Sequence, residues 1–234
     1  MRLVLKANNQ AFADYIKSDR YFLTLRSIQV SVHLLLGVLL LFLYFSYRLK
    51  KYLYVGVFCL CMFMAMLMHI FGVLEFNSVS QLNSFLLVTQ VLYIIGAFAF
   101  LNGIYTLYEQ KRSWFYYFMG LYGLLIIPFF FNFPDWSGIY NACFFPLINF
   151  EFLRLNLQGV RRRMPGAWIL LITSILFALG IIGFIWLSVI DERALSALLS
   201  SISFVIPGLG LSLFFAGEFA HTRSALHRRI LEVE

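Results

Sequence analysis

The chain has 234 residues, of which 62% are hydrophobic and 12% are charged, and its formal net charge is +7 at pH 7. A soluble domain has roughly 45–50% apolar and about 25% charged residues, so this composition excludes an ordinary water-soluble fold. The basic residues lie in short clusters between long apolar runs, which is typical of loops that set membrane topology and contact anionic lipid. We therefore expect the lipid bilayer, and no nucleic acid, as a partner.

The apolar residues form seven long runs, and we predict an all-α membrane protein with a seven-transmembrane helix bundle. A hydrocarbon layer about 30 Å thick requires about 20 helical residues to cross it. A membrane β-barrel would instead show alternating segments of about ten residues. In chain order the predicted spans are Ile28–Tyr47, Tyr52–Leu74, Phe85–Tyr108, Trp114–Phe131, Ser137–Leu157, Ala167–Ile190 and Leu195–Phe219.

These spans divide the chain into three parts. Residues 1–27 form an N-terminal tail, residues 28–219 form the seven-transmembrane domain, and residues 220–234 begin a cytoplasmic signalling helix. In the tail, the apolar residues between Ala11 and Ile28 recur at near-helical spacing. This spacing fits either an amphipathic helix on the membrane surface or a simple lead-in to the first span.

The connections between the predicted spans alternate in charge. The second, fourth and sixth carry Glu75, Asp135 and the run Asp191–Arg193, whereas the first, third and fifth are basic. Because cytoplasmic loops are enriched in lysine and arginine, we predict an outside N-terminus and a cytoplasmic C-terminus. The basic N-terminal tail opposes this orientation, so we expect that Met1 is not the native start or that the first span acts as a reverse signal anchor. The basic connections contain Arg48, Lys50, Lys51, Lys111, Arg112 and Arg161–Arg163.

Proline and glycine interrupt two of the predicted spans. Pro146 lies in the fifth span, and Pro207, Gly208 and Gly210 lie in the seventh. Proline lacks the amide that an inner helical residue donates, and glycine has a low helix propensity. We predict a hinge at each of these two places.

Several polar residues lie at a similar depth in the outer half of the predicted spans. Polar groups inside a membrane are costly, so they are candidates for a ligand-binding cavity that opens outward. The alternative is that they are hydrated or bonded to neighbouring helices. Two histidines without a third ligand are a weak metal signal, and we predict no metal and no cofactor. The candidate ligand-binding residues are His33, His69, Gln90, Asn141 and Ser203.

On the inner side, Glu151 and Arg154 lie three residues apart and therefore on one face of the fifth span. This inner polar pair has either a structural role near the cytoplasmic boundary or a role in moving protons or ions. The sequence contains no serine-protease, zinc-protease or paired-aspartate motif, so we predict no catalytic residue and no enzymatic activity in this chain.

The last span continues into a charged helix with a heptad pattern. Phe219, Leu226 and Val233 are seven residues apart, and Ile230 lies at an intervening position. Such spacing is typical of a coiled coil, and it predicts an output helix that forms a homodimer. The alternative is that the span simply ends in a basic membrane anchor.

The stretch from Ser212 to Glu234 resembles the exit helix of the bacterial seven-transmembrane receptors with diverse intracellular signalling modules. The match is carried by small residues followed by a Glu-Phe-Ala-x-Thr-x-x-x-Leu pattern. A looser similarity includes the basic turn Arg48–Tyr54 and the loop Arg161–Trp168. The matching residues of the pattern are Ala216, Glu218, Phe219, Ala220, Thr222 and Leu226.

This resemblance implies a sensory module in a bacterial inner (plasma) membrane. The module would relay a stimulus, from a small ligand or an extracellular domain, through the seventh helix to a kinase, cyclase or phosphatase domain after Glu234. The alternative that we keep is a small secondary transporter that uses Glu151 and Arg154. A lipid-modifying enzyme is the third and least favoured interpretation.

Overall fold

The computed structural model describes residues 2–71, 79–132, 134–190, 195, 199, 202–203 and 205–218. Within these residues every regular element is a helix, and none is a strand. The six labelled helices are α1 (Arg2–Tyr47), α2 (Lys50–Phe71), α3 (Val79–Leu107), α4 (Trp114–Asn132), α5 (Pro134–Arg161) and α6 (Ala167–Val189). A further apolar helix covers Val205–Glu218, and we name it the exit helix.

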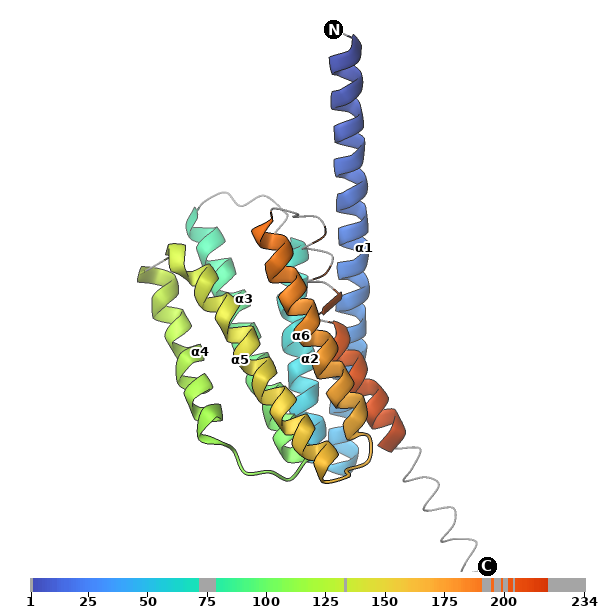
Figure 1. The fold of residues 1–234 in the computed structure, drawn as a ribbon, viewed down its shortest axis with the longest axis vertical. Coiled ribbons are helices and arrows are strands. Elements are labelled where there is room, and N and C mark those ends of the chain that lie inside the picture. Colours follow the sequence, from blue (N-terminus) through green and yellow to red (C-terminus); the bar gives the residue numbers. More distant parts are fainter. Residues whose placement is uncertain are drawn as a thin grey trace, which may run out of the picture.

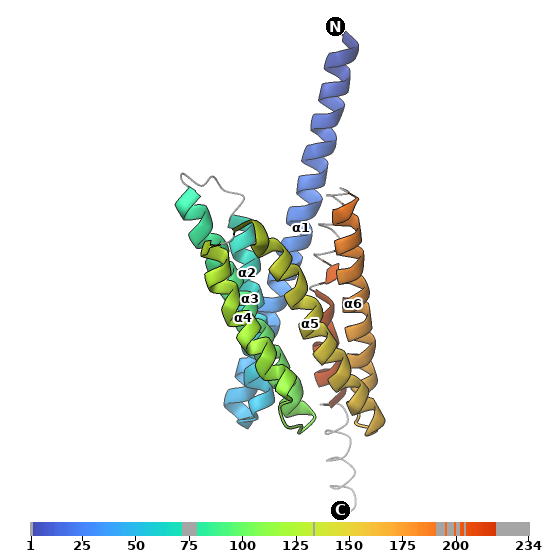
Figure 2. The same ribbon diagram turned by 60° about the vertical axis from the view of Figure 1, so that its left-hand side comes forward.

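The helices run alternately up and down and form one bundle (Figure 1). The first part of α1 extends well beyond the bundle, in the direction opposite to the end of the exit helix (Figures 1 and 2). Residues 2–27 of the predicted tail, residues 1–27, are continuous with the helix of the first predicted span. Its placement on a membrane surface stays a prediction.

Four helices are long and apolar enough to cross a membrane. They cover Arg26–Tyr47, Lys50–Met68, Ser84–Leu107 and Ala167–Leu187, which correspond to the first, second, third and sixth predicted spans. Large apolar side chains such as Leu35 (71% exposed) and Trp168 (63% exposed) face outward, as expected of a lipid-facing surface. These features indicate a membrane protein, while the count of seven spans stays a prediction.

The three basic connections lie together at one end of the bundle (Figure 1), because the helices they join are antiparallel. Each contains one non-glycine residue in the left-handed conformation: Arg48 (φ 57°), Glu109 (φ 50°) and Arg163 (φ 56°). This conformation ends a helix and lets the following amides bond its last carbonyls. At the end of α5, for example, the Met164 amide donates to the Gly159 carbonyl over 3.0 Å.

The interior of the bundle is filled by α2, α3 and α5, with α6 and the exit helix packed beside them. Leu101 and Ile104 of α3, and Phe144 and Leu155 of α5, are fully buried. Close helix approach depends on glycine, since a Cβ on Gly103 of α3 would come within 2.8 Å of a Val55 methyl group of α2.

Candidate functional site

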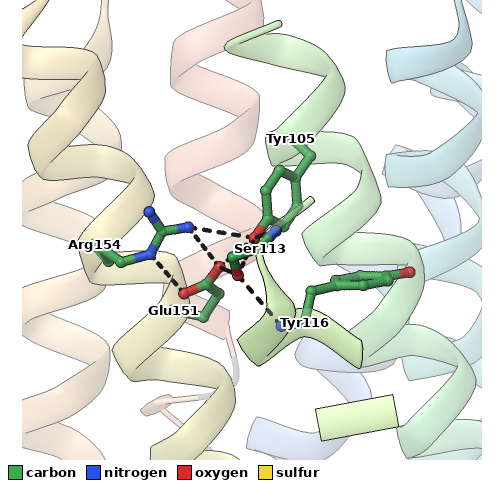
Figure 3. Close-up of polar contacts among 5 residues, drawn as sticks. All are labelled: Tyr105, Ser113, Tyr116, Glu151 and Arg154. Atoms are coloured by element: carbon green, nitrogen blue, oxygen red, sulfur yellow. Dashed lines mark hydrogen bonds and ion pairs between the residues drawn. The ribbon is translucent and has the colours of Figure 1, made fainter. Parts of the chain in front are cut away.

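A buried carboxylate organises the polar contacts at the basic end of the bundle (Figure 3). Glu151 of α5 has no exposed surface, and it forms an ion pair with Arg154 one turn later. Arg154 binds in a two-pronged manner, with Nε 2.7 Å from Oε2 and Nη2 2.6 Å from Oε1. Such paired contacts fix the geometry of a buried charge and offset part of its desolvation cost.

Two further hydroxyl groups donate to the same carboxylate from other helices. The Tyr105 hydroxyl, near the end of α3, makes a short hydrogen bond to Glu151. The Ser113 hydroxyl, directly before α4, lies 2.9 Å from Oε1 of Glu151. The network therefore joins α3, α4 and α5 around one carboxylate, which we name the Glu151 network: Tyr105, Ser113, Glu151 and Arg154.

The network is continued on the α4 side by a second set of contacts. The Tyr116 amide donates to the Ser113 hydroxyl over 3.3 Å, so Ser113 acts on the first turn of α4. The Asn102 side chain donates to the Tyr116 hydroxyl over 2.7 Å, and it accepts a bond from Arg112 Nε over 3.0 Å. These contacts hold the α3–α4 turn in one arrangement.

A separate polar contact, one turn further along the chain from Tyr105, ties α3, α5 and α6 together. The Tyr108 hydroxyl donates to Asn156 Oδ1 of α5 over 2.9 Å, and Asn156 Nδ2 donates to the Leu170 carbonyl of α6 over 3.1 Å. Both side chains are buried. Since buried polar groups are costly without partners, these two hydrogen bonds fix the relative positions of α3, α5 and α6.

The exit helix is held against α6 by small residues at several levels. A Cβ on Gly210 would overlap the Thr173 hydroxyl, and one on Gly166 would come within 2.8 Å of the Phe214 ring. Just before the exit helix begins, Ser203 also lies against α6, since a Cβ on Gly180 would overlap its hydroxyl. The two helices therefore approach more closely than any larger side chain at these glycines would allow.

The exit helix is also tied to α1 and α2. Gly208 faces His33 of α1, and the Phe215 ring lies 5.2 Å from the Tyr52 ring of α2. At the basic end, Lys51 of α2 forms an ion pair with Glu218. The exit helix thus makes contact with three other helices up to its last described residue.

The predicted outer ligand-binding residues are divided between different helix contacts. His33 is fully buried, its Nδ1 lies 2.8 Å from the Gln29 carbonyl, and its ring meets Phe58 of α2 edge-on. Ser203 is buried beside α6 and donates to the Leu199 carbonyl over 2.7 Å. Gln90 is buried in α3. The side chains of His69 and Asn141 lie outside the described residues, so a shared outer cavity stays a prediction.

Nor does the structure test the predicted hinges and output helix. Pro146 lies inside α5, which is assigned as one helix from Pro134 to Arg161, and Pro207, Gly208 and Gly210 lie within the helical segment Val205–Glu218. The output-helix positions Phe219, Leu226, Ile230 and Val233 lie outside the described residues.

Within the described part of the chain, no three metal-binding side chains come together. Cys59, Cys61 and Cys143 are free thiols. No protein-family model matches the chain, and neither does any curated protein or solved structure.

Sequence reasoning identified the Glu151–Arg154 pair but missed Tyr105, Ser113, Lys51 and the Tyr108–Asn156 contact. Each of these residues contacts a partner that is far away in the sequence, and the two meet only because of how the helices are packed and oriented about their axes. A weak signal existed, since Tyr105 and Ser113 lie on either side of a turn that leads into an apolar helix.

Proposed function

We propose that the chain is the membrane-embedded sensory module of a bacterial receptor, with its basic end in the cytoplasm and its exit helix as the output path. The three basic turns lie at one end of the bundle, which supports this orientation under the positive-inside rule. The exit helix ends at the same place, where Glu218 pairs with Lys51. In this arrangement all seven predicted spans cross the membrane.

The observation that carries the proposal is the position of the exit helix. It is packed against α1, α2 and α6 through glycine contacts and one terminal ion pair, and it leads directly into the heptad residues that begin at Phe219. The glycine contacts with α6 leave no free space between the two helices, so the exit helix cannot stay in place when α6 shifts. A stimulus that moves α6 would therefore move the output helix.

The Glu151 network supports a static role for the inner polar pair. Its carboxylate receives two bonds from Arg154 and one from each of two hydroxyl groups. A carboxylate with this many donors is held in one place, whereas an ion-carrying group in a transporter must exchange its partners. The network would serve as the fixed frame against which the exit helix moves.

The test is a helical-phase series. A dimeric histidine kinase domain is fused after Glu234, and one to four alanines are inserted after Ala220. Each inserted residue rotates the following helix by about 100°. Kinase activity should alternate between high and low across the series and largely recover at four insertions, which is close to one full turn. An activity that does not vary with insertion number would reject the receptor proposal and favour the transporter.

A further inference from the structure

An apolar cleft of about 250 Å³ lies between α1, α2 and the exit helix. Leu36, Leu39 and Leu43 of α1 form one wall, and Gly208 and Phe215 of the exit helix form the other. Its floor includes Cys59 of α2. An engineered protein cavity of about 150 Å³ already accepts benzene, so this cleft has room for part of a hydrocarbon chain.

The cleft has no unsatisfied hydroxyl group on its walls. Ser212, which contributes to the lining, donates its hydroxyl to the Gly208 carbonyl over 2.6 Å. The cleft reaches the outer surface of the bundle at Leu39, which is 50% exposed. Because this surface belongs to a membrane-spanning segment, hydrocarbon is the medium that meets the opening.

One end of the cleft adjoins the basic turn between α1 and α2. Leu43 lies one helical turn before Tyr47, and Phe215 lies one turn before Glu218, whose carboxylate is held by Lys51. The two other basic residues of this turn, Arg48 and Lys50, are exposed. The Arg48 guanidinium lies 6.0 Å from the ring centres of Tyr44 and Phe45, so its charge stays beside the lipid-facing side of α1.

We propose that the cleft and this turn together form a binding site for one anionic phospholipid. One acyl chain occupies the cleft from Leu36 to Leu43, and the phosphate lies at Arg48 and Lys50. Leu43 lies seven residues after Leu36, which corresponds to about 10 Å of helix, or about one third of the hydrocarbon layer. An acyl chain that enters from the basic end would therefore reach to about the middle of the bilayer.

The charge of the headgroup decides the affinity at this site. Transferring an acyl chain from the bilayer into an apolar cleft provides little hydrophobic driving force, because lipid tails are as apolar as leucine. Basic residues at the membrane surface attract anionic headgroups, and two of them predict a preference of roughly tenfold or more over a zwitterionic lipid.

The test uses native mass spectrometry of the purified full chain with phosphatidylglycerol or phosphatidylcholine added. We expect wild type to retain one phosphatidylglycerol per chain, with at least tenfold weaker retention of phosphatidylcholine. Leu39→Trp fills the cleft and should weaken phosphatidylglycerol binding about tenfold. Leu35→Trp is the matched control, because Leu35 lies one turn earlier on α1, is more exposed and does not line the cleft.

The headgroup contribution is tested by a second pair of variants. Arg48→Gln with Lys50→Gln should remove the preference for phosphatidylglycerol, whereas Arg161→Gln with Arg162→Gln, at the same end of the bundle, should retain it. Ala216→Phe repeats the cleft test from the exit helix, and circular dichroism and gel filtration verify folding.

The proposal is overturned if wild type binds both lipids equally. It is also overturned if Leu39→Trp and Leu35→Trp bind phosphatidylglycerol equally well. The same holds if the Arg48/Lys50 and Arg161/Arg162 glutamine variants show the same lipid preference. Any of these results would mean that only a general lipid shell contacts this surface. The measurement depends on neither membrane orientation nor signalling, so its failure leaves the helical-phase test of the proposed function unaffected.

Discussion

Lys51 and Glu218, 167 residues apart in the chain, form an ion pair that joins the first turn of α2 to the last described turn of the exit helix. Their side chains are 17% and 35% exposed, so water and salt partly screen the pair. Exposed and half-exposed pairs contribute about 0.5 to 1 kcal/mol, which is too little to hold the whole bundle together. The pair is instead placed to set the position of one helix end.

Replacement of Lys51 should therefore change signalling more than stability. Lys51→Gln should lower the free energy of unfolding by no more than about 1 kcal/mol. In the kinase fusion, however, it should shift basal kinase activity, since the exit helix loses its tie at the basic end. Lys111→Gln, in the α3–α4 turn, is the matched control. Equal activities of the two variants would contradict this role, and the exchange Lys51→Glu with Glu218→Lys should restore wild-type activity.

The two partners of the inner ion pair should respond differently to substitution. Arg154→Met leaves the fully buried Glu151 carboxylate without its cation, and we expect a loss of about 3 kcal/mol, because Tyr105 and Ser113 still donate to it. Glu151→Gln should cost about 1 kcal/mol, since the Arg154 side chain is 32% exposed and can turn to water.

Unfolding in mixed micelles with increasing dodecyl sulfate, followed by circular dichroism, measures both losses. Combining Glu151→Gln with Arg154→Met should recover part of the stability lost in Arg154→Met alone, because no buried charge is left unpaired. A larger loss for Glu151→Gln than for Arg154→Met would contradict the expectation that the main cost comes from leaving the buried Glu151 carboxylate without its cation.

Gly159 and Gly120 differ in how much space a larger side chain would have. A Cβ on Gly159 of α5 would lie 2.7 Å from atoms of the Tyr108 ring, which is itself fixed by its bond to Asn156. Gly159→Ala should thus destabilise the bundle by about 1 to 3 kcal/mol. Gly120→Ala in α4 would meet only Phe98 ring atoms at 3.8 Å, and it should leave stability unchanged or slightly raised. The same unfolding assay compares them, and equal losses would contradict the close approach of α3 and α5.

The proposed orientation is tested by the accessibility of single cysteines in a background without Cys59, Cys61 and Cys143. Lys111→Cys is exposed in the α3–α4 turn at the basic end, and Ile190→Cys is exposed at the far end of α6. In intact bacterial cells, a membrane-impermeant maleimide should label Ile190→Cys directly. It should label Lys111→Cys only after the membrane is opened. The reverse pattern would reject a cytoplasmic basic end.

The ends of α2, α4, α5 and α6 could be predicted from the sequence to within about four residues, whereas α1 and α3 begin well before the predicted Ile28 and Phe85. The predicted span Trp114–Phe131 corresponds to α4 (Trp114–Asn132), and Ala167–Ile190 corresponds to α6 (Ala167–Val189). The largest deviation is at the start of α1, which begins at Arg2, and α5 also continues to Arg161 beyond the predicted Leu157, because a helix does not have to end where its apolar run ends. Three helices, α4, α5 and the exit helix, are not among the four segments that qualify as membrane spans by length and composition in the described residues.

The sequence by itself determined that the chain forms long apolar helices and which of their connections are basic. Both follow from local properties: a backbone in hydrocarbon must satisfy its own hydrogen bonds, and only long apolar runs avoid the cost of exposing polar side chains to lipid. Only the tertiary structure decided that Lys51 meets Glu218, and that Tyr105 and Ser113 converge on Glu151. The lipid-facing and inward faces of these helices are almost equally apolar, so no periodicity in the sequence fixes how each helix is rotated. The rotation is set by glycine contacts and by the few buried polar groups that must find partners on other helices.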